Sequence, residues 1–203
     1  LDVFGYKDFG KSWEYEGNIG VNTVFEEQGW WEFYLCNTIS WQVKKWYMVE
    51  GSLELHDTQD PNSSDYIEVR PWLAQKFIFT QFIKRIHLEK PYFYVRLDQR
   101  FFWYPEDDTS DVKTRMRLRL GGKFLLNKVR LAPKTLYLPF YFEAFFNFNG
   151  EAFEHKAAKA RGTVGLGYAF SERWRSELNY YAMIGRNTIN NDVTRTDLIF
   201  QIL

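Results

Sequence analysis

The chain lacks several features that commonly hold a small protein together or anchor a helix in a membrane. Its 203 residues include 1 cysteine, Cys36, which excludes an internal disulfide framework. No apolar run approaches the roughly 20 residues that a transmembrane helix needs. No signal peptide is visible at Leu1, so we expect either that there is none or that the chain is mature or partial. Lysine and arginine (26) balance aspartate and glutamate (26), so no basic excess points to nucleic acid.

Aromatic residues and period-two alternation are what the sequence has in abundance. Aromatics make up 20% of the chain. The mean hydropathy of −0.44 does not exclude a membrane protein, because a membrane strand gives only every second residue to lipid. Helical periodicity is scarce, and we expect about ten strands, with eight to twelve possible. The expected spans are 13–25, 30–43, 46–56, 65–79, 91–104, 112–124, 136–148, 159–170, 173–186 and 194–203. The segment 80–90 is ambiguous between strand ends and a short helix.

The stretch "KTRMRLRLGG" (113–122) is the clearest alternation, with Arg115, Arg117 and Arg119 between apolar residues. Same-face neighbours on a strand lie about 6.6–6.8 Å apart. Two like charges at that distance repel by about 0.6 kcal/mol in water but by about 2.5 kcal/mol at an effective dielectric near 20. An enclosed arginine row therefore needs acids from neighbouring strands.

Such acids occur on the polar faces of other predicted strands, and we expect them to form one charged lattice with the arginines. Apolar faces, many of them rich in Phe, oppose these polar faces. The predicted lumen network consists of Glu68, Arg70, Arg96, Asp98, Arg100, Arg115, Arg117, Arg119, Glu143, Arg161 and Glu177.

Two all-β folds fit this alternation: a soluble lipocalin-like barrel with its apolar faces inward, and a transmembrane up-and-down barrel with them outward. Three features favour the transmembrane antiparallel barrel with a polar, ionic lumen. These are the bulky Phe residues, the mixed charges with small residues on the polar faces, and aromatics near strand ends that resemble interfacial girdles. The predicted girdle consists of Trp30, Trp31, Trp41, Trp46, Tyr47, Trp103, Tyr104, Tyr168 and Trp174.

The connections alternate between short turns and longer polar loops, as in outer-membrane barrels. With a periplasmic N-terminus the acidic loops "HDTQDPNSSD" and "PEDDTSD" fall outside the cell, which matches an even strand number. No internal repeat or linker is visible, so we expect residues 1–203 to form one domain.

The residues that could act in catalysis or bind a metal are not spaced as in a recognised catalytic or metal-binding motif. No HExxH or CxxC motif is present, and solvated loop residues are the simplest interpretation of His56 and His155. His56 with Asp57 and Asp60, or His155 with Glu154, remains a weak candidate for a hydrolase or protease site at the barrel rim. The acidic loops could bind a divalent cation, although they lack the EF-hand order, and we expect no cofactor or metal.

The order "YIEVRPWLAQKF", "YVRLDQRFF", "TRMRLRLGGKF", "FYFEAFFNF" and "RGTVGLGYAFSERWRSELNYY" resembles the DUF2490 family. This resemblance implies an outer-membrane barrel, found mainly in Bacteroidetes, and brings no catalytic residues. The family usually ends on an aromatic residue at or near its terminus, whereas this chain ends "IFQIL".

The leading hypothesis is therefore an integral barrel of the Gram-negative outer membrane, without catalytic activity. It would act as a structural or accessory subunit of a larger envelope complex, with outer-membrane lipid and other outer-membrane or periplasmic proteins as partners. The alternative is a narrow channel for small anionic solutes lined by the arginine lattice. A rim enzyme comes third, and the soluble binder is least expected.

Overall fold

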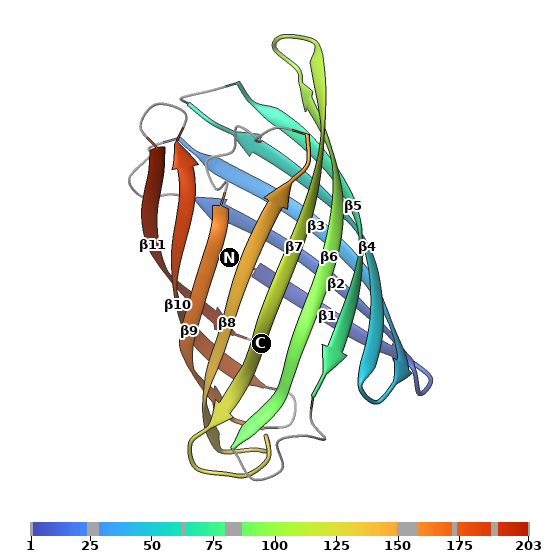
Figure 1. The fold of residues 1–203 in the computed structure, drawn as a ribbon, viewed down its shortest axis with the longest axis vertical. Helices are drawn as coiled ribbons and strands as arrows, with labels where there is room; N and C mark the ends of the chain where they lie inside the picture. The colour runs from blue at the N-terminus through green and yellow to red at the C-terminus, as the bar shows by residue number, and fades with distance from the viewer. Residues whose placement is uncertain are drawn as a thin grey trace.

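The computed structural model is all-β, and its strands form one antiparallel sheet in chain order, from β1 to β11 (Figure 1). The residues described are 2–23, 29–61, 64–79, 87–149, 158–171, 174–187 and 191–202. The strands are β1 Asp2–Phe9, β2 Trp13–Thr23, β3 Trp31–Lys44, β4 Tyr47–Gln59, β5 Tyr66–Ile78, β6 Leu88–Tyr104, β7 Thr109–Leu125, β8 Thr135–Asn147, β9 Ala158–Ala169, β10 Arg175–Asn187 and β11 Asn191–Ile202. No helix in this part of the chain is long and apolar enough to cross a membrane.

The prediction of an antiparallel, up-and-down, all-β fold is confirmed, but the strand count differs by one. Strand β1 was not predicted, because it has 8 residues, includes Gly5 and alternates poorly. Its pairing with β2 follows a turn in which Gly10 has a φ of 73°, a conformation that glycine adopts without steric cost. The described sheet thus has an odd number of strands, and the expectation of an even number is wrong for it.

Two ends of predicted strands, most of the ambiguous segment and one predicted loop lie outside the described residues. They include 24–25, 80–86, residue 173 and the loop with Glu154 and His155. Residues 88–90 of the ambiguous segment belong to β6, and the basic loop 126–134 joins β7 to β8 as expected.

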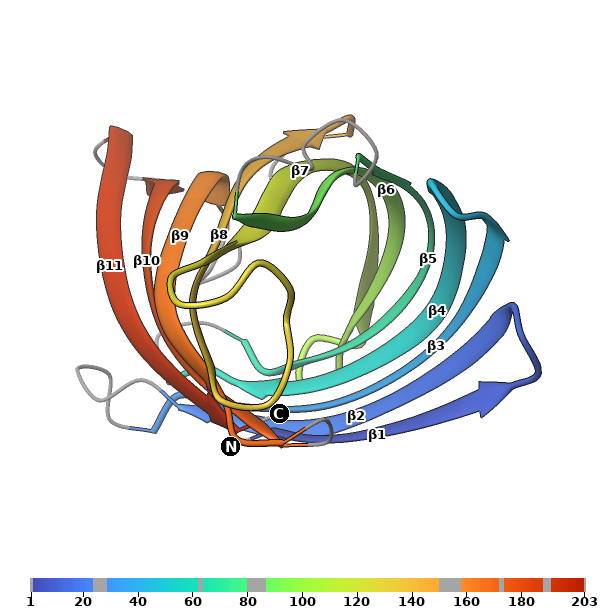
Figure 2. The same cartoon turned by 90° about the horizontal axis from the view of Figure 1, so that it is seen from below.

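The sheet curls round on itself and encloses an interior on its concave side (Figure 2). Among the described residues β1 and β11 are not paired with each other, so they are the two edges of the sheet. Tyr6 on β1 nevertheless interacts electrostatically with Arg175 and Glu177 on β10, the strand next to the β11 edge. The β6–β7 hairpin, formed by the two 17-residue strands, projects beyond its neighbours at one end (Figure 1).

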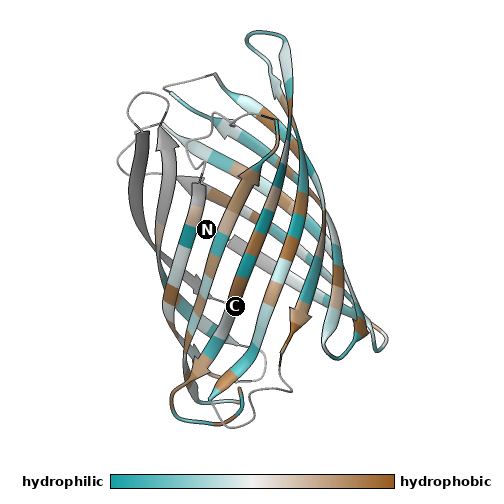
Figure 3. Ribbon diagram, viewed as in Figure 1, coloured by the Kyte–Doolittle hydropathy of each residue, from teal (hydrophilic) through white to brown (hydrophobic). Residues whose placement is uncertain are grey.

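Burial alternates along β5 and β6 and along parts of β3, β4 and β8 with the period of the sequence pattern, and polar and apolar colours alternate in the same way (Figure 3). On β5, Glu68, Arg70 and Trp72 are buried, whereas Ile67 and Leu73 are exposed. The distribution is the reverse of a water-soluble core, since buried charges are rare unless they are paired. The concave side therefore holds charged residues and the convex side holds large apolar ones.

Candidate functional site

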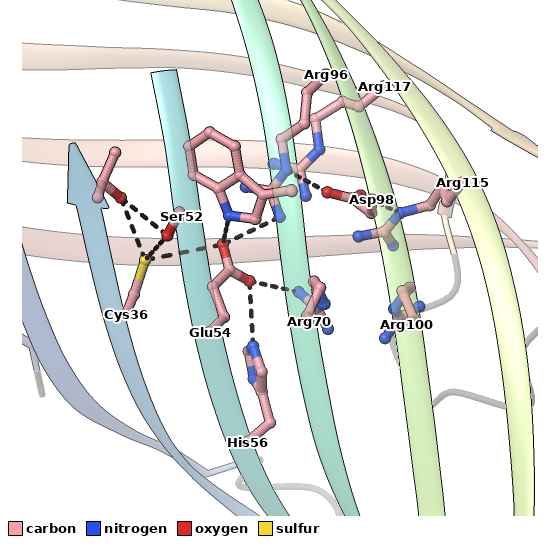
Figure 4. Close-up of polar contacts among 12 residues, drawn as sticks. Cys36, Ser52, Glu54, His56, Arg70, Arg96, Asp98, Arg100, Arg115 and Arg117 are labelled. Carbon is pink, nitrogen blue, oxygen red and sulfur yellow. Dashed lines mark hydrogen bonds and ion pairs between the residues drawn. The ribbon is translucent and has the colours of Figure 1, made fainter. Parts of the chain in front are cut away.

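The ionic network on the concave side is the candidate site, and Glu54 on β4 is one of its centres. The Glu54 carboxylate accepts hydrogen bonds from Arg70 (3.0 Å) and Trp72 (2.5 Å) on β5. It also lies 3.0 Å from Arg96 on β6 and 3.2 Å from the His56 ring (Figure 4). Sequence reasoning missed Glu54, although it alternates with Leu53 and Leu55 as an inward residue does.

Glu68 holds two arginines by paired hydrogen bonds. Arg70 donates from Nε and Nη2 at 2.5 and 2.7 Å, and Arg100 on β6 donates at 2.6 Å from each of the same two positions. The exposed fractions of Glu68 and Arg100 are both 1%. Two-pronged guanidinium–carboxylate contacts of this kind are among the stronger hydrogen bonds in proteins and fix geometry as well as charge.

Asp98 and Glu143 are the carboxylates that pair with the arginine row on β7. Asp98 accepts from Arg96 and, at 2.9 Å, from Arg115. Glu143 on β8 accepts from Arg119 at 2.7 Å and from Arg161 on β9 at 2.5 Å. The expected counter-charges thus come from both flanking strands, β6 and β8.

Arg117 has the longest carboxylate contact of this group. Its Nη1 lies 3.7 Å from Glu143, and its buried Nε has no hydrogen-bond partner. The register places Arg117 directly opposite Arg96, and like charges in opposed positions destabilise a sheet.

Glu177 on β10, which was expected in the same lattice, belongs to a separate cluster. It accepts from Lys123 on β7 at 2.6 Å and from the Tyr137 hydroxyl on β8 at 2.8 Å. These contacts span strands that are not adjacent, so side chains bridge the concave side here. Neither Lys123 nor Tyr137 was identified from the sequence.

Aromatic rings on the concave side supply further compensation for the cations. The guanidinium groups of Arg115, Arg117 and Arg161 lie 5.4, 5.2 and 5.8 Å from the centre of the Phe145 ring. The guanidinium of Arg96 lies 4.1 Å from the Trp72 ring. Such contacts stabilise a desolvated cation by about 2 kcal/mol or more.

Among the described side chains, neither His56 nor His87 has a hydrogen bond to a serine, threonine or cysteine that it could activate as a nucleophile. The prediction that His56 is a solvated loop residue is wrong. His56 lies in β4, is 9% exposed, and contacts Glu32 at 3.0 Å as well as Glu54. The ring of His87 contacts the Leu125 carbonyl at 3.1 Å. Within the described ranges no group of His, Cys, Asp and Glu side chains is arranged to hold a metal ion.

The predicted girdle residues divide between the two sides of the sheet. Trp41, Trp46, Trp103 and Trp174 are exposed, with exposed fractions between 42% and 63%. Trp31, Tyr47 and Tyr168 have intermediate exposure. Two depart from the expectation: Trp30 is 3% exposed, and Tyr104 contacts the buried rings of Tyr66 and Phe102. Trp13, which stacks on Trp41 at 5.5 Å, was missed.

Fold and site define an antiparallel single-sheet protein with an ionic concave side and an apolar convex side. The chain matches the family model described as "Protein of unknown function (DUF2490)" over residues 1–194, and it belongs to that family. No curated protein matches it. No solved structure matches it either.

Proposed function

We propose that the protein is an integral β-barrel of the Gram-negative outer membrane that acts without catalysis, as a structural or accessory subunit of an envelope complex. The observation that carries this proposal is the inverted distribution of polarity. Glu68, Asp98, Arg100 and Glu143 are at most 1% exposed, whereas Leu73 and Phe142 are 69% and 57% exposed. In water so large an apolar surface would drive association, whereas lipid covers it favourably.

The density of ion pairs on the concave side supports a filled interior. Arg70, Arg96, Arg100, Arg115 and Arg119 all contact carboxylates at 3.0 Å or less. Moving one member would leave its partner charge buried and uncompensated, which is strongly unfavourable. A rigid interior of this kind suits a scaffold better than a conduit.

An apolar groove of about 430 Å³ on the convex side supports the docking role. It lies over β7 to β10, with Leu120, Phe142, Gly162, Val164 and Tyr180 among its lining residues. Gly162 leaves open space there, because a Cβ at this position would meet nothing within 4 Å. A membrane-embedded ridge of a neighbouring subunit is the occupant that this proposal requires.

The test is extraction of native outer membrane in mild detergent, affinity purification through this chain, and mass spectrometry. A stoichiometric set of envelope proteins is the expected result. Gly162→Trp should fill the groove and lose these proteins, while Leu73→Trp on β5, away from the groove, should keep them. A chain absent from the outer membrane, or one that always purifies alone, would contradict the proposal.

A narrow channel for small anions is the second candidate, and the arginine-rich concave side favours it. Steady single-channel conductance in planar bilayers, with anion preference lost in Arg117→Ala, would support this candidate over the scaffold.

A further inference from the structure

Arg117 on β7 has the loosest carboxylate contact among the buried arginines of the interior network. Its Nη1 lies 3.7 Å from Glu143, whereas Arg70, Arg96, Arg100, Arg115 and Arg119 each lie within 3.0 Å of a carboxylate. A further source of negative charge would stabilise a buried guanidinium that is paired so loosely.

Arg117 also faces Arg96 on β6, so two cations are directly opposed across this pair of strands. Arg96 and Arg119 are both like-charge neighbours of Arg117. The Arg96 side chain is 7% exposed, and the Arg117 side chain is 13% exposed. Water therefore screens this repulsion little.

Each of the two opposed arginines also has a buried nitrogen without a hydrogen-bond acceptor. These are Nε of Arg117 and Nη2 of Arg96. Arg96 Nη2 lies 3.0 Å from Glu54, but the contact does not have hydrogen-bond geometry. Two such donors on directly opposed residues are what a bridging acceptor would satisfy.

The carboxylates nearest to Arg117 already accept hydrogen bonds from other arginines. Glu143 accepts from Arg119 and Arg161 at 2.7 and 2.5 Å, which leaves Arg117 at 3.7 Å. Asp98 accepts from Arg96 and Arg115. The Phe145 ring beside Arg117 offers a quadrupole but no hydrogen-bond acceptor.

We propose that Arg96 and Arg117 form a binding site for a small tetrahedral oxyanion of the phosphate class, which bridges their facing guanidinium groups. Guanidinium groups bind phosphate oxygens by paired N–H donors, and the anion would offset the like-charge opposition between β6 and β7. This site is independent of whether the barrel docks to partners, and it is compatible with either a filled or a conducting interior.

The test follows the unfolding midpoint of the purified full chain in detergent, with inorganic phosphate, acetate and chloride compared at equal ionic strength. A ligand that binds only the folded state raises the midpoint in a saturable way. The wild type should show this rise with phosphate, less with acetate, and none with chloride. A wild type with the same midpoint in all three salts would overturn the proposal.

The Arg117→Gln variant distinguishes a phosphate-binding role of Arg117 from a purely structural ion pair. In chloride its midpoint should equal or exceed that of the wild type, because an under-paired charge is removed, and its affinity for phosphate should fall at least tenfold. Arg130→Gln, in the exposed loop 126–134, is the matched control and should behave as wild type. A variant that is destabilised in chloride but keeps the phosphate response would also overturn the proposal.

Isothermal titration of the wild type with phosphate gives a measurement that needs no variant. Saturable binding of about one phosphate per chain is expected, and the absence of heat from specific binding, together with an unchanged midpoint, would exclude the site. Because this readout uses the purified chain, it is unaffected by the outcome of the co-purification experiment.

Discussion

At the scale of single residues, Glu54 has five polar partners from four strands, so its charge should matter to stability. Glu54→Gln keeps the shape of the side chain but leaves Arg70 and Arg96 with one carboxylate fewer. Removing one partner of a buried ion pair typically costs about 3–5 kcal/mol. We expect a loss of that order in the free energy of unfolding, measured by urea titration in lipid vesicles.

Glu50→Gln is the matched control on the same side of β4. Its carboxylate lies 3.8 Å from Lys76, whose side chain is 30% exposed. A contact of this kind is worth about 1 kcal/mol or less. Equal losses in the two variants would contradict a special role for Glu54.

Gly167 leaves space for the ring of Tyr137, its cross-strand partner on β8. A Cβ at Gly167 would lie 2.4 Å from that ring, which is held by the hydrogen bond from Tyr137 to Glu177. We expect Gly167→Ala to destabilise the fold by about 1–3 kcal/mol, the usual cost of overpacking. The same urea titration measures it.

Gly162→Ala on the same strand should have the opposite sign. A Cβ there meets nothing within 4 Å, and replacing a strand glycine by alanine recovers about 0.5–1 kcal/mol of conformational free energy. Similar losses in both alanine variants would show that strand flexibility, and not the Tyr137 ring, explains the glycines.

The inward direction of the arginine row was predictable from the sequence, whereas its partners were not. Alternation alone places Arg115, Arg117 and Arg119 on one side of β7. Pairing depends on register and on side-chain reach across strands, which brings Glu54 to Arg96 from two strands away and Lys123 to Glu177 from three. His56 was assigned to a loop because the expected strand ended at residue 56. In the structure β4 continues for three more residues, to Gln59.

At the scale of whole strands, the convex side of β6 tests whether lipid surrounds the sheet. Leu97 is 51% exposed between the buried residues Arg96 and Asp98. An arginine facing lipid near the bilayer midplane costs about 2–4 kcal/mol, whereas an exposed site in water tolerates the change within about 0.5 kcal/mol. We expect Leu97→Arg to destabilise the protein in vesicles by the larger amount.

The control for Leu97→Arg is Val129→Arg, in the loop between β7 and β8. Val129 is 74% exposed and lies outside the strands, so this substitution should be neutral. A neutral Leu97→Arg in vesicles would mean that the convex side of β6 does not face hydrocarbon.

Strand existence was predictable wherever alternation was long, and β1 shows the limit of that signal. Strands β6 and β7 each have 17 residues and contain the clearest alternation. Strand β1 pairs through backbone hydrogen bonds with a neighbour that alternates well, so its own side chains carry little information.

At the scale of the whole molecule, the formal net charge is zero, but many of the acidic residues and most of the network arginines lie in different halves of the interior. Strands β2 to β4 contribute Glu14, Glu16, Glu32, Glu50 and Glu54, whereas most of the arginines of the network lie on β6 and β7. A space between walls of opposite charge carries a transverse field, which is weakly screened where water is excluded. Whether water and ions reach that space distinguishes the scaffold from the channel.

The native Cys36 on β3 reports on that access without any substitution. Its Sγ lies 3.4 Å from Ser52 Oγ and 3.8 Å from Glu54, on the concave side. If the interior is filled, charged methanethiosulfonate reagents should label Cys36 at least about tenfold more slowly than an exposed thiol, an added barrier of roughly 1.4 kcal/mol. The exposed reference is Val129→Cys in a Cys36→Ser background. Rapid labelling of Cys36, with a ratio between anionic and cationic reagents that changes in Arg117→Gln, would instead mean that the field lies along an open path and that the channel is the better description.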